Sequence, residues 1–255
     1  MRFGRPVAPV TRATADEQMH GNAIDSSNLG LLQIDILRRP TYTVLALSGE
    51  LDISTSELLG EGFRRVAYRS DESRVLLDLD RLAFIDSTGL HKIAKLARLM
   101  GARLTVRPGP HRKLFSLTAL DMTLELVNEL PDPEPLAAAA HNIGYVRNLY
   151  NLWWLSGLEA MIEHVPRDVE WEPSPADGRV LKGSDELLRY WSGAEPTPAA
   201  RSAWFEAIDD DVMIETEHEL PDGGSRRIHS LYMFAGSRLV RAIAVQAVAV
   251  GEPHP

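Results

Sequence analysis

The stretch Phe84-Ile85-Asp86-Ser87-Thr88-Gly89-Leu90 is the most informative part of the N-terminal half of the chain. It joins an apolar strand predicted over residues 75–79 to an amphipathic helix predicted to end near Met100. Asp, Ser and Thr are preferred at helix N-termini, and a glycine allows the backbone to bend sharply and leaves space above it. The stretch therefore predicts a hydroxyl group at the start of a helix.

Ser87 and Thr88 are candidates for phosphorylation. A phosphate here would meet unpaired backbone N–H groups and the positive end of the helix dipole, so we do not expect it to unfold the domain. It would add about −1.5 to −2 charges to a corner that already carries Asp86, and would thereby repel a docked partner. The alternative is that both hydroxyl groups only cap the helix.

Strands and helices alternate on both sides of this turn. A predicted strand ends in the turn Gly49-Glu50-Leu51-Asp52. After the helix that ends near Met100, the apolar pattern again predicts a strand and then a helix. The other predicted elements cover residues 42–49 (strand), 54–68 (helix), 102–107 (strand), 111–117 (helix) and 124–127 (a short apolar run).

Three motifs in this order resemble the STAS domain of anti-sigma factor antagonists: Gly49-Glu50-Leu51-Asp52, Asp86-Ser87-Thr88-Gly89-Leu90 and Arg112-Lys113-Leu114-Phe115, with Leu120-Asp121 after them. The resemblance spans about residues 31–128. It implies an α/β fold, a mixed sheet of four or five strands with helices mainly on one face.

The resemblance also implies partner switching, which regulates transcription, as in stress responses. In such a switch the unphosphorylated domain binds an anti-sigma factor serine kinase, the kinase phosphorylates it, and a phosphatase reverses the mark. The hydroxyl group that matches the phosphorylated position is that of Ser87, with Thr88 less favoured. The partner-binding residues implied are Asp52, Asp86, Ser87, Thr88 and Gly89.

Composition limits the classes of function. The chain has 255 residues and 44% hydrophobic residues, enough for two domains, and its net charge of −9 argues against a nucleic-acid-binding surface. The absence of cysteine excludes disulfides and thiolate sites. Because no metal-ligand spacing or phosphate loop is present, no metal or cofactor is expected. No apolar run has the length of a membrane span, so we expect no membrane association and a cytoplasmic location.

Composition also changes along the chain. Residues 1–30 are poor in large apolar side chains and predict a flexible extension, followed by the STAS domain over residues 31–130. Pro131, Pro133 and Pro135 predict an extended linker over residues 131–137. A second domain is expected over residues 138–250.

The sequence of the second domain predicts helices first and long strands last. Helices are predicted over residues 137–155, 158–165 and 184–191, the last capped by Ser184. Strands are predicted over 168–172, 179–183, 201–208 continuing into 212–220, 226–234 and 238–250, with turns at 221–224 and 235–237.

This order resembles the SnoaL-like, nuclear-transport-factor-like α+β cone with a curved antiparallel sheet. The resemblance rests on the helix junction at residues 150–158, Asp168-Val169-Glu170-Trp171, the Lys182-Gly183 turn and the long final strands. It implies a small isomerase or cyclase, or a binding or assembly module. Such cones often form homodimers through the exposed face of the sheet.

Polar residues that could face a cavity in this cone are few. His164 and Asp168 lie four residues apart and could form a pair facing a pocket near Trp171. His218 or His229 could also supply a polar group inside the cone. The alternative for each histidine is a surface or capping position, and the tryptophans are more often core residues than ligand contacts.

Glu215, Glu217 and Glu219 alternate along one predicted strand and therefore share one face, which is typical of a solvated surface. His218 would then point to the opposite face with Ile214 and Thr216.

The leading hypothesis is an anti-sigma factor antagonist that switches through Ser87 and is not an enzyme. Its C-terminal domain would sense a small-molecule ligand or dimerise. The alternative is a small-molecule isomerase or cyclase regulated by its STAS domain, and a third hypothesis is a structural scaffold.

Overall fold

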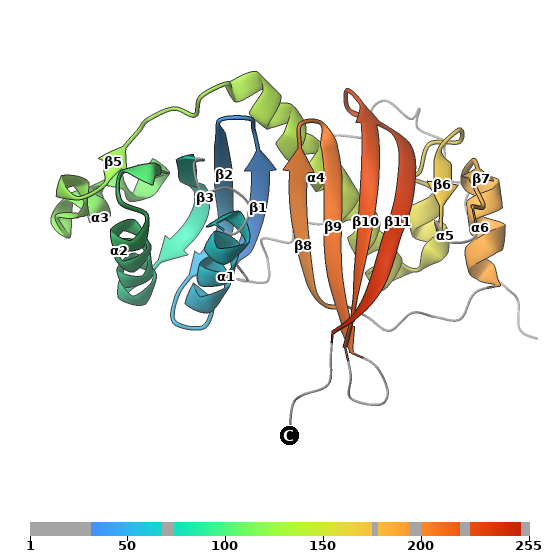
Figure 1. The fold of residues 1–255 in the computed structure, drawn as a ribbon, viewed down its shortest axis with the longest axis horizontal. Helices are drawn as coiled ribbons and strands as arrows, with labels where there is room; N and C mark the ends of the chain where they lie inside the picture. The colour runs from blue at the N-terminus through green and yellow to red at the C-terminus, as the bar shows by residue number, and fades with distance from the viewer. Residues whose placement is uncertain (1–31, 68–73, 175–177, 194–199, 220–224, 251–255) are drawn as a thin grey trace, which may run out of the picture.

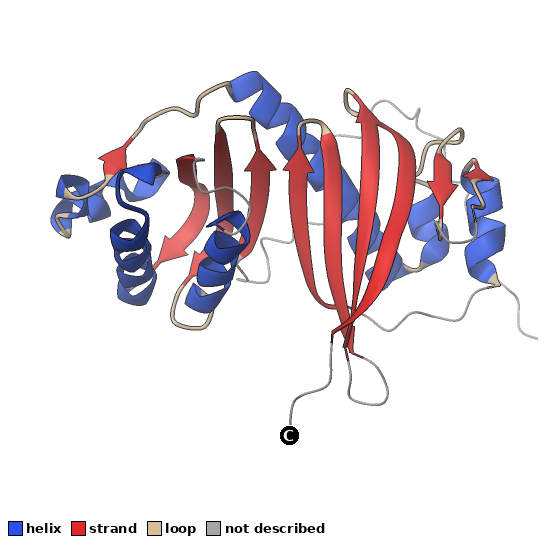
Figure 2. Ribbon diagram, viewed as in Figure 1, coloured by secondary structure: helices blue, strands red, loops and turns tan. Residues whose placement is uncertain are grey.

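The computed structural model describes residues 32–67, 74–174, 178–193, 200–219 and 225–250. In these ranges the strands form one sheet of 11 strands, in the order β5-β4-β3-β2-β1-β8-β9-β10-β11-β6-β7 (Figure 2). The predicted extension over residues 1–30 and the predicted turn at 221–224 lie outside the described residues.

The N-terminal region contains five strands and three α-helices. In chain order they are β1 (Gln33–Arg38), β2 (Tyr42–Leu51), α1 (Ser56–Ala67), β3 (Arg74–Ile85), α2 (Ser87–Met100), β4 (Leu104–Arg107), α3 (Arg112–Leu117) and β5 (Glu125–Leu126), with short 3₁₀ turns at Gly101–Arg103, Gly109–His111 and Leu120–Met122. β1 is antiparallel to β2, and β2, β3, β4 and β5 run parallel. Strand β3 is longer than the predicted 75–79 and reaches the turn before α2.

Helices α1 and α2 cover one face of this half of the sheet (Figure 1). Parallel strands need crossover connections, and both helices provide one. Leu59 and Phe63 of α1 and Ile93 of α2 pack on Leu45 and Leu77 in one buried cluster. This part of the fold agrees with the expected α/β class.

The other face of the same strands is covered by α4 (Pro133–Ser156). Val44 and Ala46 of β2 pack there against Ile143 and Val146 of the helix, in a second buried cluster. Successive strand residues point to opposite faces, so β2 is buried on both sides. This explains its nearly continuous run of apolar residues.

The two halves of the molecule are joined by strand pairing. β1 pairs in parallel with β8 (Ala200–Ile208), from Asp35 opposite Phe205 to Arg38 opposite Ile208. The prediction of an extended linker over residues 131–137 is wrong from Pro133 onward, because Pro133 and Pro135 lie in the first turn of α4. Proline is tolerated there, since the first N–H groups of a helix have no intrahelical partner.

The C-terminal region follows with two further helices and six strands. They are α5 (Leu158–Ile162), β6 (Glu170–Glu172), β7 (Leu181–Lys182), α6 (Ser184–Ser192), β8, β9 (Asp211–Glu219), β10 (Ser225–Ala235) and β11 (Arg238–Val250). β8 to β11 are antiparallel, β6 joins β11 in parallel, and β7 is the predicted hairpin partner of β6. The expected α+β arrangement with a long antiparallel sheet is confirmed.

Two local predictions differ from the structure. The run predicted to continue from 201–208 into 212–220 is a hairpin, because the chain reverses at Asp209, which has a φ of +55°. Ser184 does not cap α6: it is the first helical residue, and the N-cap is Gly183, which has a φ of +82°. The predicted turn at 235–237 is present between β10 and β11. In the described ranges no helix is long and apolar enough to cross a membrane.

Candidate functional site

The turn between β3 and α2 presents Ser87 to solvent. Asp86 is the N-cap of α2, and its Oδ1 accepts a hydrogen bond from Gly89 N at 2.8 Å. Its carbonyl oxygen accepts from Leu90 N at 3.0 Å. Ser87 is therefore the first residue of the helix rather than its cap, and its side chain is exposed, whereas that of Thr88 is half-buried.

Within the described residues, neither hydroxyl group of this turn has a hydrogen-bond partner, and the same holds for the backbone N–H groups of Ser87 and Thr88. The alternative that both hydroxyl groups cap the helix is wrong, since Asp86 has that role. The Ser87 hydroxyl is therefore exposed and unbonded within the described residues.

Gly89 has a packing role that differs from the expected one. A Cβ built on it would lie 2.6 Å from the carbonyl oxygen of Leu51 and 2.8 Å from the Leu51 Cγ. The residue is helical rather than sharply bent. The prediction of open space at Gly89 is therefore wrong: a glycine is needed because α2 starts in contact with the end of β2.

Asp52 lies beside this turn, because Asp86 N donates to Leu51 O at 3.1 Å. The Asp52 Oδ1 accepts hydrogen bonds from the Ser54 hydroxyl at 2.7 Å, from Ser54 N at 2.8 Å and from Thr55 N at 3.1 Å. The Ser54 hydroxyl is the largest influence in lowering the pKa of Asp52. The carboxylate stays ionised and shapes the loop before α1.

Two exposed apolar side chains flank these residues. Ile53 is 77% exposed and follows Asp52, and Phe84 is 49% exposed and precedes the turn. We call Asp52, Ile53, Phe84, Asp86, Ser87 and Thr88 the Ser87 surface. Neither Ile53 nor Phe84 was among the predicted binding residues. The sequence feature that could have indicated Ile53 is an isoleucine inside a polar loop.

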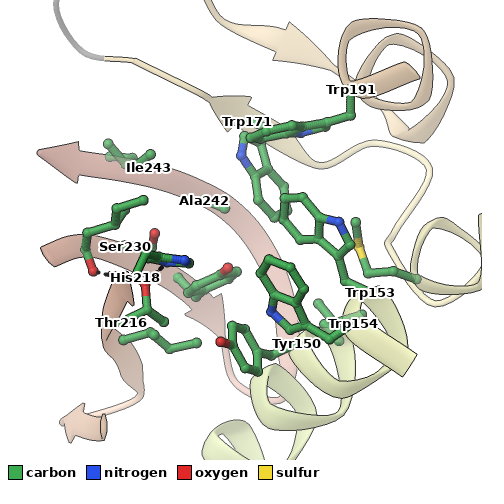
Figure 3. Close-up of a pocket in the computed structure, with 16 residues that line it drawn as sticks. Tyr150, Trp153, Trp154, Trp171, Trp191, Thr216, His218, Ser230, Ala242 and Ile243 are labelled. Carbon is green, nitrogen blue, oxygen red and sulfur yellow. Dashed lines mark hydrogen bonds between the residues drawn. The ribbon is translucent and has the colours of Figure 1, made fainter. Parts of the chain in front are cut away.

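The C-terminal region encloses a cavity of about 100 Å³ between α4 and the sheet (Figure 3). We call it the aromatic cavity, because six of its lining residues are aromatic: Tyr150, Trp153, Trp154, Trp171, Trp191 and Tyr232. The ring centroids of Trp153 and Trp191 lie 4.9 Å apart in an edge-to-face arrangement.

The remaining tryptophan, Trp204, does not line this cavity. It packs in the buried cluster of the N-terminal region, with the guanidinium group of Arg65 lying 4.4 Å from the centroid of its ring. The prediction that Trp171 borders a pocket agrees with the structure.

Polar groups occupy one side of the aromatic cavity, where His218, Thr216 and Ser230 lie together (Figure 3). His218 is only 4% exposed, and its Nε2 lies 2.9 Å from the Thr216 hydroxyl. That hydroxyl also donates a long hydrogen bond to Ile228 O at 3.4 Å. The predicted inward direction of Ile214, Thr216 and His218 is confirmed.

The predicted pair of His164 and Asp168 does not form. Both side chains are exposed and neither lines the cavity. His164 Nδ1 contacts Ala160 O at 3.0 Å at the end of α5, whereas Asp168 pairs with Arg238, which lowers the pKa of the Asp168 carboxyl. Nearness in sequence across a helix end did not bring the two groups together.

Glu215 also departs from its predicted environment. Its side chain is 14% exposed and pairs with Arg65 of α1 at 2.7 Å. Burial alone would raise the pKa of Glu215, but the hydrogen bond and charge of Arg65 outweigh it, and the pKa is lowered. The predicted solvated face is therefore partly covered by α1. Glu217 pairs with Arg227 at 3.3 Å, and the side chain of Glu219 lies outside the described residues.

His229 is on the face of Glu215, with its Nε2 at 3.5 Å from the Glu215 carboxylate, so it does not enter the cavity. Burial raises the pKa of Tyr150 to about 12 and raises that of Tyr232 as well, which keeps both phenols neutral. None of the described lining residues is a carboxylate. No group of three His, Asp or Glu in the described ranges could hold a metal ion.

Comparison with known proteins supports the assignment of the N-terminal region. Residues 33–108 match the family model of the STAS domain. No match was found among curated proteins. An anti-sigma factor antagonist from Mycobacterium paratuberculosis is similar in structure, with 25% identity, 40% of this chain and 90% of that chain covered, and a TM-score of 0.36.

Two further solved structures are similar to the chain. An NTF2-like protein of unknown function from Burkholderia pseudomallei has 16% identity, covers 41% of this chain and 88% of that one, and has a TM-score of 0.34. Another from Burkholderia xenovorans has 13% identity, covers 46% and 89%, and has a TM-score of 0.37. The family match makes residues 33–108 a STAS domain, which contains the first two of the three motifs and ends before Arg112-Lys113-Leu114-Phe115.

Proposed function

We propose that the protein is an anti-sigma factor antagonist that acts by partner switching through Ser87. In this proposal the Ser87 surface binds an anti-sigma factor serine kinase in the cytoplasm, the kinase phosphorylates Ser87, and the complex dissociates. A phosphatase restores the binding form. The supporting observation is the exposed, unbonded hydroxyl of Ser87 at the first position of α2, inside a STAS domain.

The local chemistry fits such a switch. Transfer breaks the bond between the γ-phosphorus of the kinase-bound ATP and the oxygen that bridges it to the β-phosphate, joins the γ-phosphoryl group to Ser87 Oγ and releases ADP, while the hydroxyl proton is lost to solvent. The N–H groups of Ser87 and Thr88 are unpaired in the described structure, whereas Asp86 occupies those of Gly89 and Leu90. The phosphate therefore has two donors close by, and the helix start is retained.

The same phosphate weakens binding. It adds about −1.5 to −2 charges next to Asp86 and close to the ionised Asp52. Ile53 and Phe84 supply the apolar part of the contact in both states. The switch thus changes the charge of the Ser87 surface without removing its apolar anchors.

The first experiment maps phosphorylation by mass spectrometry after incubation with ATP and extract of the source cells. We expect one phosphate on Ser87, none on this peptide in Ser87→Ala, and an unchanged yield in Ser116→Ala, which removes another exposed serine hydroxyl from α3. An unmodified wild-type Ser87 would contradict the proposal.

The second experiment measures binding to the kinase isolated in this way. Ser87→Ala should remain bound in the presence of ATP, whereas Ser87→Asp should bind at least about tenfold more weakly because of the added charge. Equal affinities of the two variants would argue against a charge switch.

For the C-terminal region we propose ligand binding rather than catalysis. The supporting observation is the aromatic cavity itself, whose described lining is mostly aromatic and apolar. Turnover of any ligand that His218→Asn abolishes would favour the enzyme instead. A homodimer through the exposed face of the sheet stays a prediction, to be checked by the mass in solution.

A further inference from the structure

We propose that the aromatic cavity is a regulatory site for the Ser87 surface. It takes a small, neutral, single-ring aromatic molecule with one hydrogen-bonding substituent, and its occupancy is transmitted through β9 to Arg65 and α1. This inference rests on the proposed function, because ligand binding is inferred to change the Ser87 surface, to which that function assigns partner binding.

The size and lining of the cavity define the ligand. An apolar cavity of about 150 Å³ is known to hold benzene, so the volume of about 100 Å³ here limits the ligand to a single ring and excludes a fused ring system. The walls are aromatic, and His218, Thr216 and Ser230 provide hydrogen-bonding groups on one side. No lining residue in the described part is an acid or a permanently charged base, so a neutral ligand is favoured.

Strand β9 connects this cavity to the N-terminal region. Thr216 lines the cavity, whereas its neighbour Glu215 points to the opposite face and pairs with Arg65 of α1. Successive residues of a strand face opposite sides on one backbone. A displacement of β9 on ligand binding therefore moves the partner of Arg65 as well.

Arg65 fixes α1 against the C-terminal region by more than one contact. Its guanidinium group pairs with Glu215 of β9 at 2.7 Å and lies over the ring of Trp204 of β8. It lies in the last turn of α1, and the helix begins directly after the Asp52 loop. A change at Arg65 thus reaches the Ser87 surface through one short helix.

The experiment uses phenol as the probe and toluene as a molecule of the same shape without the hydroxyl. Binding to the full chain is followed by tryptophan fluorescence, and amide hydrogen exchange is followed by mass spectrometry. We expect phenol to bind at least about fivefold more tightly than toluene, because a site built for a hydroxyl group rejects the analogue that lacks it. When phenol binds, the rate of amide hydrogen exchange over residues 50–60 and 86–92 should change about twofold or more.

Two matched variants test the path. Glu215→Gln should bind phenol with unchanged affinity but lose the exchange response at residues 50–60. Glu217→Gln, on the same face of the same strand but paired with Arg227 rather than α1, should keep it. Thr216→Val should remove the preference for phenol over toluene.

Each part of the inference has its own failure. If phenol does not bind, or binds no better than toluene, the ligand site is overturned. If phenol binds without an exchange response, or the response survives in Glu215→Gln, the transmission is overturned. If exchange responds but Ser87 is never phosphorylated, the coupling holds and the proposed partner switch fails.

Discussion

The two halves of the shared sheet present their candidate sites in different ways. In the N-terminal half, mainly aliphatic side chains fill both faces, and the candidate phosphorylation site, Ser87, lies outside on the turn. In the C-terminal half, large aromatic rings leave a space between α4 and the sheet, and the polar groups lie inside. In the functions proposed above, the tightly packed half carries a site for a macromolecule, and the half with aromatic packing around a cavity carries a site for a small molecule.

The largest expected loss of stability comes from breaking the ion pair between Arg147 and Asp35. Arg147 of α4 pairs with Asp35 of β1, whose side chain is 4% exposed. Arg147→Leu should lower the free energy of unfolding by about 3 kcal/mol, because it leaves a buried carboxylate with only the longer contact to Arg81. Urea unfolding measures this.

Arg238→Leu is the matched control, since its partner Asp168 is exposed. We expect the midpoint of its unfolding to stay close to that of the wild type. Similar losses in both variants would mean that the Asp35 contact does not join the halves.

The second prediction compares glycines in helices of the two halves. Gly89→Ala should destabilise by about 2 kcal/mol, because the new methyl group meets the backbone of Leu51. Gly144→Ala in α4, where a Cβ would meet nothing within 4 Å, should stabilise by about 0.5–1 kcal/mol. Thermal unfolding measures the change in stability of each variant. A change of the same sign in both variants would contradict the difference in packing between the two glycines.

The third prediction concerns the ion pair between Glu215 and Arg65, which joins the halves on the face of the sheet opposite α4. Glu215→Gln should cost about 1 kcal/mol at pH 7, between the values for exposed and buried pairs. Because the folded-state pKa of Glu215 is lowered, its contribution is present above the ordinary glutamate value of about 4.3 and is lost as the pH falls through the folded-state pKa. Unfolding at several pH values should show the two proteins converging in acid, and a constant difference would contradict the assignment.

The local elements could be predicted from sequence because their signals are local. Asp86 and Gly89 mark the start of α2, and alternation along β9 correctly placed His218 inside. The join between β1 and β8 could not be predicted, because Asp35 and Phe205 are far apart in the chain and no local pattern specifies their register.

The errors in the candidate site have the same origin. Alternating glutamates are typical of a solvated face, but α1 from the other half covers Glu215. His164 and Asp168 are close in sequence, yet each finds a different partner at the surface. In both cases the deciding contact is tertiary.

The pairing of β1 with β8 also has a consequence for solubility. An unpaired strand edge is a template for aggregation, and each half on its own would expose a long one. In the joined sheet the described margins are β5 and β7, each only two residues long. Cleaving the chain between the halves would uncover the edges of β1 and β8, so each fragment should tend to associate with copies of itself.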